Sequence, residues 1–193
     1  YTGAEQSITT YTGEDSLVSG QSSNVSYIAK GTDVGEYTGT ITAADEIKIT
    51  DGAGTDVTAN YTISSEPGKL TITKTDEQLT VTLADDEYPY DGQPHSNAKT
   101  PVTNEKSGTT TVEYSKDGET WTTDLSSLTA TNVADSFTIQ VRATNPNYKN
   151  TATTTAKLTI TAIEVKFVGA SDSKEYTGAE QSITTYTGED SLV

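Results

Sequence analysis

The stretch Lys69-Leu70-Thr71-Ile72-Thr73 recurs, letter for letter, as Lys157-Leu158-Thr159-Ile160-Thr161. In both copies apolar and polar side chains alternate, which is the period of a β-strand with one face buried and one face in water. The same alternation runs through residues 79–83 and 137–143. Because no stretch shows the 3.6-residue apolar period of a helix, the pattern predicts an all-β fold.

The composition narrows the range of functions. The 193 residues carry a net charge of −16, only 32% hydrophobic residues, no cysteine and one histidine, His95. A chain this acidic repels a phosphate backbone, so we expect no nucleic-acid partner. Without cysteine there is no disulfide, thiol nucleophile or zinc–thiolate site. No window approaches the ~20 apolar residues of a membrane helix, so no membrane insertion of this segment is expected.

A long repeat organises the chain. Residues 1–18 read YTGAEQSITTYTGEDSLV, and residues 176–193 read the same 18 letters, which gives a period of 175 residues. A fold alone tolerates many substitutions on water-facing positions, so this identity indicates a tandem unit that has been copied with little divergence. We therefore expect the chain to be a window of one period within a longer periodic object.

A weaker repeat divides each period into two modules. Tyr1-Thr2-Gly3 is matched by Tyr90-Asp91-Gly92, and Asn60-Tyr61 is matched by Asn147-Tyr148, each ahead of a KLTIT strand. We name residues 1–74 module A and residues 77–161 module B, and residues 162–193 begin the next module A. Each has the size of a β-sandwich. The prediction is tandem Ig-like β-sandwich modules in an elongated array, with less than one turn of helix per module; a β-grasp module would instead need one real helix.

The first strand of each module precedes its Tyr-x-Gly turn. In module B this strand is residues 79–83, and its counterpart ahead of Tyr176 is Ile163-Glu164-Val165-Lys166-Phe167-Val168. The sequence therefore predicts a strand over 163–168 and a first module A that lacks its opening strand. Two arrangements remain open. Either the modules are covalently continuous, which we favour, or separate subunits join by strand complementation.

Two turns have recognisable chemistry. Lys116-Asp117-Gly118-Glu119 predicts a hairpin turn between two short strands. Asp33-Val34-Gly35-Glu36-Tyr37 has the spacing of a tyrosine corner, in which the tyrosine hydroxyl bonds to the backbone. Module B has Phe137 in place of the tyrosine, so that bond is not expected there.

The motifs together resemble the MBG/YDG-type and bacterial Ig-like tandem repeats of large bacterial surface proteins. The resemblance rests on the following stretches: Tyr88-Pro89-Tyr90-Asp91-Gly92-Gln93-Pro94-His95, Tyr176-Thr177-Gly178, residues 31–37, residues 60–63 leading to 68–73, and residues 142–148. It covers nearly the whole chain and implies a secreted or wall-attached adhesin-like protein, with no catalytic residues to carry over. Module B departs from it where Asn132-Val133-Ala134 replaces Asp-Val-Gly.

Several residues are candidate sites, and each favours a structural interpretation. Tyr88, Tyr90 and His95 fit a structural turn better than an aromatic ligand platform. Trp121 fits the core better than a sugar-stacking surface. The acidic stretches 51–56 and 85–87 lack a calcium-loop spacing. An isopeptide bond is also conceivable, either between Lys157 and Asn97 or Asn104, or between Lys48 and Asn60. The spacing does not single out one of these pairs.

These observations predict no catalysis, no cofactor and no metal site. The expected function is a structural stalk or fibre segment of an extracellular bacterial surface protein, whose partners are adjacent copies of the same repeat, end to end. Host or matrix glycans would be contacted through other regions of such a protein. The alternative is a carbohydrate- or mucin-binding repeat module, or an accessory region of a cell-surface enzyme. A glycan array probed with a chain of two periods would distinguish the structural stalk from the carbohydrate-binding repeat.

Overall fold

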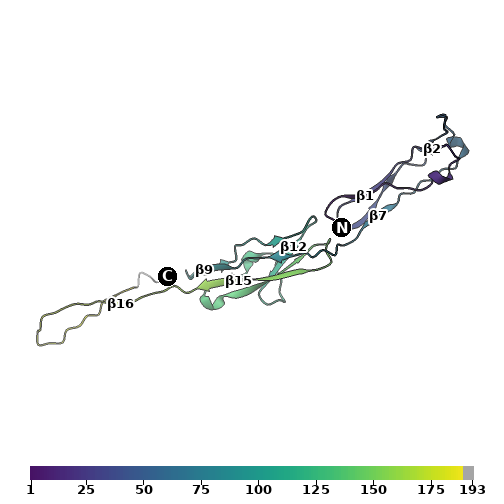
Figure 1. Ribbon diagram of the computed structural model, residues 1–193. Helices are drawn as coiled ribbons and strands as arrows, with labels where there is room; N and C mark the ends of the chain where they lie inside the picture. The colour runs from purple at the N-terminus through teal and green to yellow at the C-terminus, as the bar shows by residue number, and fades with distance from the viewer. Residues whose placement is uncertain (189–193) are drawn as a thin grey trace. The chain divides into compact units, whose positions relative to one another are not determined.

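A computed structural model describes residues 1–188 and is built from short β-strands (Figure 1). The all-β prediction is confirmed. Within residues 1–188, helix occurs only as four 3₁₀ turns of three residues each, namely η1 (Glu14–Ser16), η2 (Thr58–Asn60), η3 (Leu125–Ser127) and η4 (Val133–Asp135). The expectation of less than one turn per module is thus wrong, since each module has two. No α-helix occurs in residues 1–188, which does not fit a β-grasp module.

Module A contains three small antiparallel sheets. The first has the order β1 (Gln6–Ile8), β3 (Tyr27–Gly31) and β5 (Thr40–Ile41), the second pairs β2 (Ser22–Ser23) with β6 (Ile49–Thr50), and the third pairs β4 (Gly35–Thr38) with β7 (Lys69–Ile72). Alternate residues of β3 are buried and exposed, as the period of a half-buried strand requires. The hydrophobic core of module A consists of five buried residues from several elements, namely Tyr27, Ala29, Ile47, Ile49 and Ile72.

Two glycines make room for the largest of these side chains. A Cβ atom at Gly39 would lie 2.3 Å from the Tyr27 ring, and one at Gly68 would lie 2.9 Å from the Tyr27 hydroxyl. The Gly39 N–H donates to the Gly68 carbonyl oxygen at 2.9 Å, which fixes the two backbones around the ring. Any larger residue at Gly39 would displace Tyr27 from the core.

Module B is built around a mixed four-stranded sheet. Its order is β12 (Thr111–Ser115), β14 (Phe137–Thr144), β15 (Ala152–Thr161) and β9 (Asp86–Pro89), and β9 runs parallel to β15. Two small sheets accompany it: β8 (Val81–Thr82) with β11 (Val102–Thr103), and β10 (His95–Ser96) with β13 (Thr129–Ala130). Ile139, Val141, Leu158 and Ile160 of this sheet are at most 1% exposed and belong to the core.

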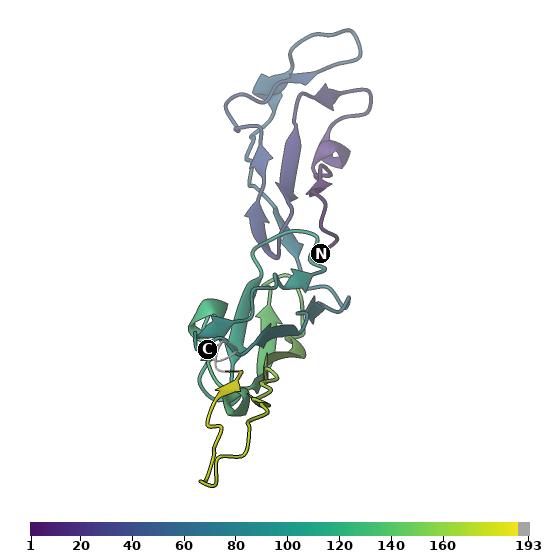
Figure 2. The same ribbon diagram turned by 90° about the vertical axis from the view of Figure 1, so that its left-hand side faces the viewer.

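The C-terminal part is a long hairpin closed by β16 (Val168–Gly169) and β17 (Tyr186–Thr187), drawn in yellow-green to yellow in Figure 2. The predicted strand over residues 163–168 is wrong in extent, because only Val168 belongs to a strand. A strand needs a hydrogen-bonded neighbour, and residues 163–167 have none among the described residues. Pairing begins only where the second copy of the repeated sequence returns to Val168.

The described chain divides into two compact units. Unit 1 comprises Tyr1–Thr80 together with two segments of module B, Thr103–Thr111 and Ala143–Ala152. Unit 2 comprises Val81–Val102, Val112–Arg142 and Thr153–Val193, of which residues up to 188 are described. Module A is therefore packed in one unit with two loops of module B. The predicted boundaries at residues 74 and 77 stay a prediction.

Candidate interface between the modules

Two loops of module B belong to unit 1 and contact module A. We name them the receiving loops, residues 106–108 and 145–148. Gly108 has φ of +81° and lies so close to Asn147 that a Cβ atom would come within 2.5 Å of its Nδ2. Only glycine accepts both this backbone conformation and this approach. The Asn145 side chain holds the second loop, because its Oδ1 accepts from the Asn147 N–H at 2.9 Å and its Nδ2 donates to Thr110 Oγ1.

Asn147 is the centre of the contact with module A. It is 1% exposed, and its Nδ2 donates to Asp33 Oδ1 at 2.8 Å and to the Ser107 carbonyl oxygen at 3.2 Å. Its Oδ1 accepts the backbone N–H of Val34 at 2.7 Å. Ser107 Oγ donates to the same carboxylate oxygen of Asp33 at 2.8 Å. One buried amide thus satisfies a carboxylate and a backbone N–H from the other module.

The tyrosine corner presents these groups to Asn147. The Tyr37 hydroxyl donates to the Asp33 carbonyl oxygen at 2.8 Å, as its spacing predicts. This bond fixes the turn that carries the Asp33 carboxylate and the Val34 N–H. Module B holds its matching turn differently, with a capping box between Asn132 and Asp135.

Tyr1 adds an aromatic contact. Its hydroxyl lies 3.1 Å from the Ser107 carbonyl oxygen and 2.9 Å from Ser107 Oγ, and its ring meets Tyr148 edge to face at 5.8 Å between centroids. Tyr148 is 2% exposed, and its hydroxyl accepts the Lys106 N–H at 3.2 Å. An edge-to-face pair of this kind contributes about 1 kcal/mol beyond its buried area.

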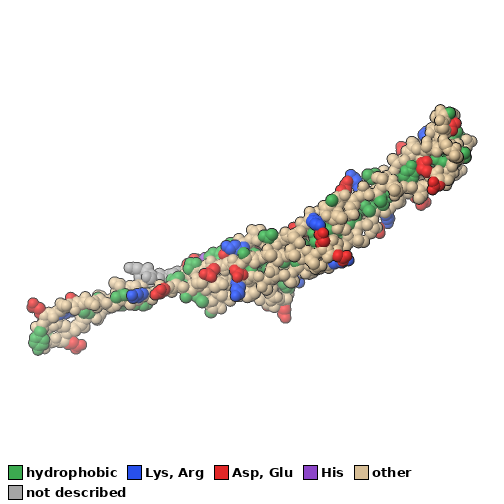
Figure 3. Space-filling model, viewed as in Figure 1, with side chains coloured by type: hydrophobic (Ala, Val, Ile, Leu, Met, Phe, Trp, Pro, Cys, Tyr) green, Lys and Arg blue, Asp and Glu red, His purple; other side chains and the backbone are tan. Residues whose placement is uncertain are grey.

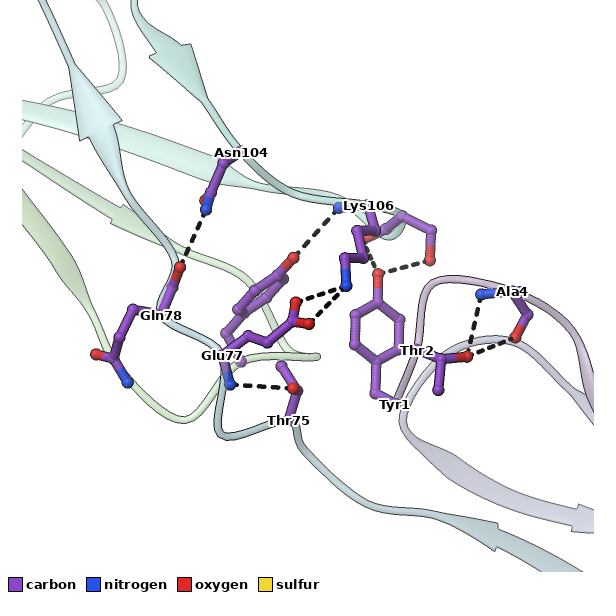
Figure 4. Close-up of polar contacts among 10 residues, drawn as sticks. Tyr1, Thr2, Ala4, Thr75, Glu77, Gln78, Asn104 and Lys106 are labelled. Carbon is purple, nitrogen blue, oxygen red and sulfur yellow. Dashed lines mark hydrogen bonds and ion pairs between the residues drawn. The ribbon is translucent and has the colours of Figure 1, made fainter.

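The joint between the modules is tied to the same loops. The Thr75 N–H donates to the Asn147 carbonyl oxygen at 3.0 Å. Lys106 pairs with Glu77, shown in Figure 4, and Lys149 pairs with Asp76. The hydrogen bond to Glu77 raises the pKa of Lys106. These ion pairs are exposed, so the buried contacts of Asn147 and Tyr148 dominate the interface.

Asparagines also hold the first strand of module B. The Asn150 side chain makes two hydrogen bonds with the backbone of Leu79, because its Oδ1 accepts the Leu79 N–H and its Nδ2 donates to the Leu79 carbonyl oxygen, both at 2.9 Å. Asn104 Oδ1 accepts the Thr80 N–H at 2.8 Å, and Asn97 Nδ2 donates to the Ala84 carbonyl oxygen at 2.9 Å. Asn97 and Asn104, weighed as isopeptide partners of Lys157, are therefore engaged with backbone groups.

Tyr88 and His95 come together, as residues of one turn. Their rings stack at 4.3 Å between centroids, the Tyr88 hydroxyl donates to Asp86 Oδ2, and His95 Nε2 lies 2.9 Å from Asp91 Oδ1. Burial opposes ionisation of Asp86, but the Ala98 N–H and the Lys99 ammonium outweigh it and lower its pKa. Tyr90 takes part through its backbone, whose N–H donates to the Thr161 carbonyl oxygen.

Trp121 is not a core residue, contrary to the expectation. It is half-buried, and its Nε1 donates to the Gly118 carbonyl oxygen at 3.1 Å. The Arg142 guanidinium lies over its ring at 4.1 Å and makes a two-pronged ion pair with Glu113. The hairpin turn keeps the indole near the surface, because Asp117 and Ser115 accept the turn's N–H groups and fix its position.

The acidic stretches are arranged around backbone groups. Asp51 Oδ1 accepts the N–H groups of Ala53 and Thr55, and Asp56 accepts that of Thr58. Asp85 accepts the Lys157 N–H at 2.7 Å. Within residues 1–188 no three histidine or acidic side chains gather where they could hold a metal ion. None of the helices in these residues has the length or the apolar character to cross a membrane.

Sequence reasoning missed Ser107 and Asn147 as interface residues. The available signal was the pair Asn147-Tyr148 and its counterpart Asn60-Tyr61, together with the glycine-containing pairs Ser107-Gly108 and Ser19-Gly20. Neither a scan against protein-family models nor searches of curated proteins and solved structures finds a match for this chain.

Proposed function

We propose that this chain is a non-catalytic structural segment of an extracellular bacterial surface protein, built of tandem Ig-like β-sandwich modules that stack end to end. The observation that carries the proposal is the interface around Asn147, because it joins one module to the next through buried hydrogen bonds. A flexible tether between independent domains would need no such contact. The 18-residue identity at a period of 175 residues supplies the repetition.

Both free ends of the two-module unit carry matching chemistry. In module A the Val18 N–H donates to the Tyr61 hydroxyl at 3.2 Å, as Lys106 does to Tyr148, and Gly20 has φ of +86° beside Ser19. Asn60 takes the place of Asn147 and is exposed. Module A therefore presents its own pair of receiving loops, which would accept the end of a preceding module B.

Module B also has counterparts of the module A residues that contact the receiving loops. The N–H of Tyr90 donates to the Thr161 carbonyl oxygen at 2.9 Å, and the backbone nitrogen of Tyr1 donates to that of Thr73 at 2.8 Å. Asn132 and Val133 stand where module A has Asp33 and Val34, and both are exposed. Repetition of one type of junction would then produce a stalk.

Solution scattering on chains of one, two and three periods tests the proposal. A stalk of stacked modules gives a maximum dimension that grows by a constant increment per period. Growth with the square root of the number of periods, as flexibly joined domains give, would contradict it. A glycan array with the two-period chain addresses the binding alternative, for which the stalk proposal expects no bound glycan.

A further inference from the structure

Module A has an apolar groove that runs along one side of its core. The floor is formed by Val25, Ile41, Ile47 and Ile49, and the hollow has a volume of about 290 Å³. It continues into a second hollow, shares Tyr11 and Thr12 with it, and ends at Lys69 on β7. Hydrophobic side chains are visible on the surface of this part of the molecule in Figure 3.

Module B has its own first strand at the corresponding position. β8 pairs with β11, and the side chains of Leu79, Val81 and Leu83, in and beside β8, are 2%, 5% and 7% exposed. Residues 102–103 of β11 correspond to the chain near η1 in module A, and Asn150 corresponds to Ile63. Both of these counterparts line the groove of module A. The groove is thus the place that residues 79–83 fill in module B.

One edge of β7 lacks the parallel neighbour that β15 has in module B. In module B, β9 runs parallel to β15 from the pair Asp86–Leu158 to the pair Pro89–Thr161, and the next contact is Tyr90 N–H to Thr161. In module A only that last contact exists, from Tyr1 to Thr73. Within the described residues β7 pairs with β4 alone. Leu158 is 0% exposed, whereas its counterpart Leu70 is only half-buried.

The second copy of the repeated sequence shows the missing partner. There, Val168 pairs with Thr187 and Gly169 with Tyr186, and these two partners are the second copies of Thr12 and Tyr11. The Phe167 ring meets the Tyr186 ring edge to face at 5.9 Å. The segment before Tyr176 therefore lies against the second copies of two residues that line the groove.

A repeated glycine sharpens this comparison. Gly13 and Gly188 occupy the same place in the two copies and have φ of +122° and +126°. A Cβ atom at Gly188 would lie 2.5 Å from the Lys166 carbonyl oxygen, whereas one at Gly13 would meet nothing within 4 Å. The same backbone conformation is covered by residues 166–167 in the second copy and bare in the first.

We propose that the groove of each module A is filled by the sequence of residues 163–175 from the directly preceding period of a continuous chain. Val165 and Phe167 precede Tyr176 by 11 and 9 residues, as Leu79 and Val81 precede Tyr90. Both side chains enter the groove, and Lys166 comes to lie beside the acidic turn η1, which carries Glu14. Since Ser16 and Ile63 replace Asn104 and Asn150, the two amides that hold the first strand of module B are absent here, and the apolar side chains of the groove hold the segment instead.

The parallel ladder fixes the register of the remainder. Asp172 to Glu175 extend along the open edge of β7, beside Leu70 to Thr73, and lead directly into the existing contact of Tyr1 with Thr73. This inference rests on the proposed tandem array and adds to it how one period completes the next. A continuous chain is favoured because residues 163–175 are joined directly to a copy of the module that they would complete.

The test places residues 163–175 before Tyr1 of the full 193-residue chain and measures amide hydrogen exchange by NMR. We expect exchange at Tyr11–Gly13 and along β7 to slow by about tenfold or more relative to the unextended chain. The matched control carries Val165→Asp and Phe167→Asp in the added segment only, and we expect it to exchange like the unextended chain. Amides of β14 and β15 serve as an internal reference and keep their rates.

Equal exchange in the extended chain and its charged control would overturn the inference. A third sample contains the unextended chain with the free 163–175 peptide at millimolar concentration. Protection by the peptide equal to that by the covalent segment would overturn the commitment to a continuous chain and indicate complementation between subunits. Neither result bears on whether maximum dimension grows linearly with the number of periods, so failure of the stalk proposal is detected separately.

Discussion

Modules A and B follow one design, and the difference between them is completeness. Module B has a parallel strand beside β15, a first strand held by three asparagines, and a central sheet in which Ile139, Val141, Leu158 and Ile160 are at most 1% exposed. Module A has the matching strand β7 with an open edge and a groove over its core. The difference is what the proposal above expects if a complete module includes the segment that precedes its Tyr-x-Gly turn.

The largest expected effect separates the cores of the two modules. Leu158→Ala removes a fully buried side chain between two strands and should lower the free energy of unfolding of module B by about 3–5 kcal/mol. Leu70→Ala, at the matching position beside the open edge, should cost only about 1–2 kcal/mol in module A. Urea unfolding of both variants measures the difference. Equal costs would show that the open edge leaves the core of module A unaffected.

Removal of the Asn147 amide should destabilise the interface between the modules. Asn147→Ala leaves the Asp33 carboxylate and the Val34 N–H without their buried partner, so we expect a loss of about 2–4 kcal/mol. Asn60→Ala is the matched control at the corresponding, exposed position of module A. Its side chain has no hydrogen-bond partner within residues 1–188, and the change should stay within about 0.5 kcal/mol. Similar losses of stability in both variants would contradict the central role of Asn147 in the interface.

The tyrosine corner offers a smaller contrast. Tyr37→Phe deletes the hydroxyl bond to Asp33 and should destabilise module A by about 1 kcal/mol, because the turn that meets Asn147 loses its brace. Phe137→Tyr in module B should gain nothing, since the capping box of Asn132 and Asp135 already holds that turn. Thermal unfolding of the two variants decides the point, and a gain from the added tyrosine would contradict it.

A smaller effect concerns pH and the hairpin turn of residues 116–119 in module B. Backbone N–H groups of Thr120 and Glu119 donate to Asp117 and lower its pKa from 3.8 to about 2. Since the folded pKa lies below the unfolded one, the ionised carboxylate stabilises the fold above pH 3.8, and this contribution is lost as the pH falls through about 2. Asp117→Asn should flatten the dependence of the unfolding midpoint on pH between 4 and 2. An unchanged slope would contradict the assignment.

A matched substitution in module A checks the same reasoning. Asp51 accepts the N–H groups of Thr55 and Ala53, and its pKa is lowered for that reason. Asp51→Asn should flatten the same pH range, by less than Asp117→Asn does. A larger effect at Asp51 would indicate that the module B turn is already open at low pH.

Several features were predictable because they depend on neighbours in the sequence. The alternation in residues 69–73 and 157–161 indicated strands, the Asp33-to-Tyr37 spacing predicted the hydroxyl bond, and Asp117-Gly118 predicted a turn. The strand over residues 163–168 was overestimated, since its propensity is local but its pairing depends on a partner strand. Trp121 was misplaced for a related reason, because the hairpin and Arg142 decide its burial.

The sequence by itself determined the strand period, the turns and the 175-residue repeat, since each of these is written in the spacing of nearby residues or in identity of letters. Only the tertiary structure decided which side chains meet across distances of more than a hundred residues, as Asn147 meets Asp33 and Val34. It also decided that Gly13 is bare where Gly188 is covered. The physical reason is that hydrogen bonding and burial depend on the partner that the fold brings near, and identical local sequences can have different partners.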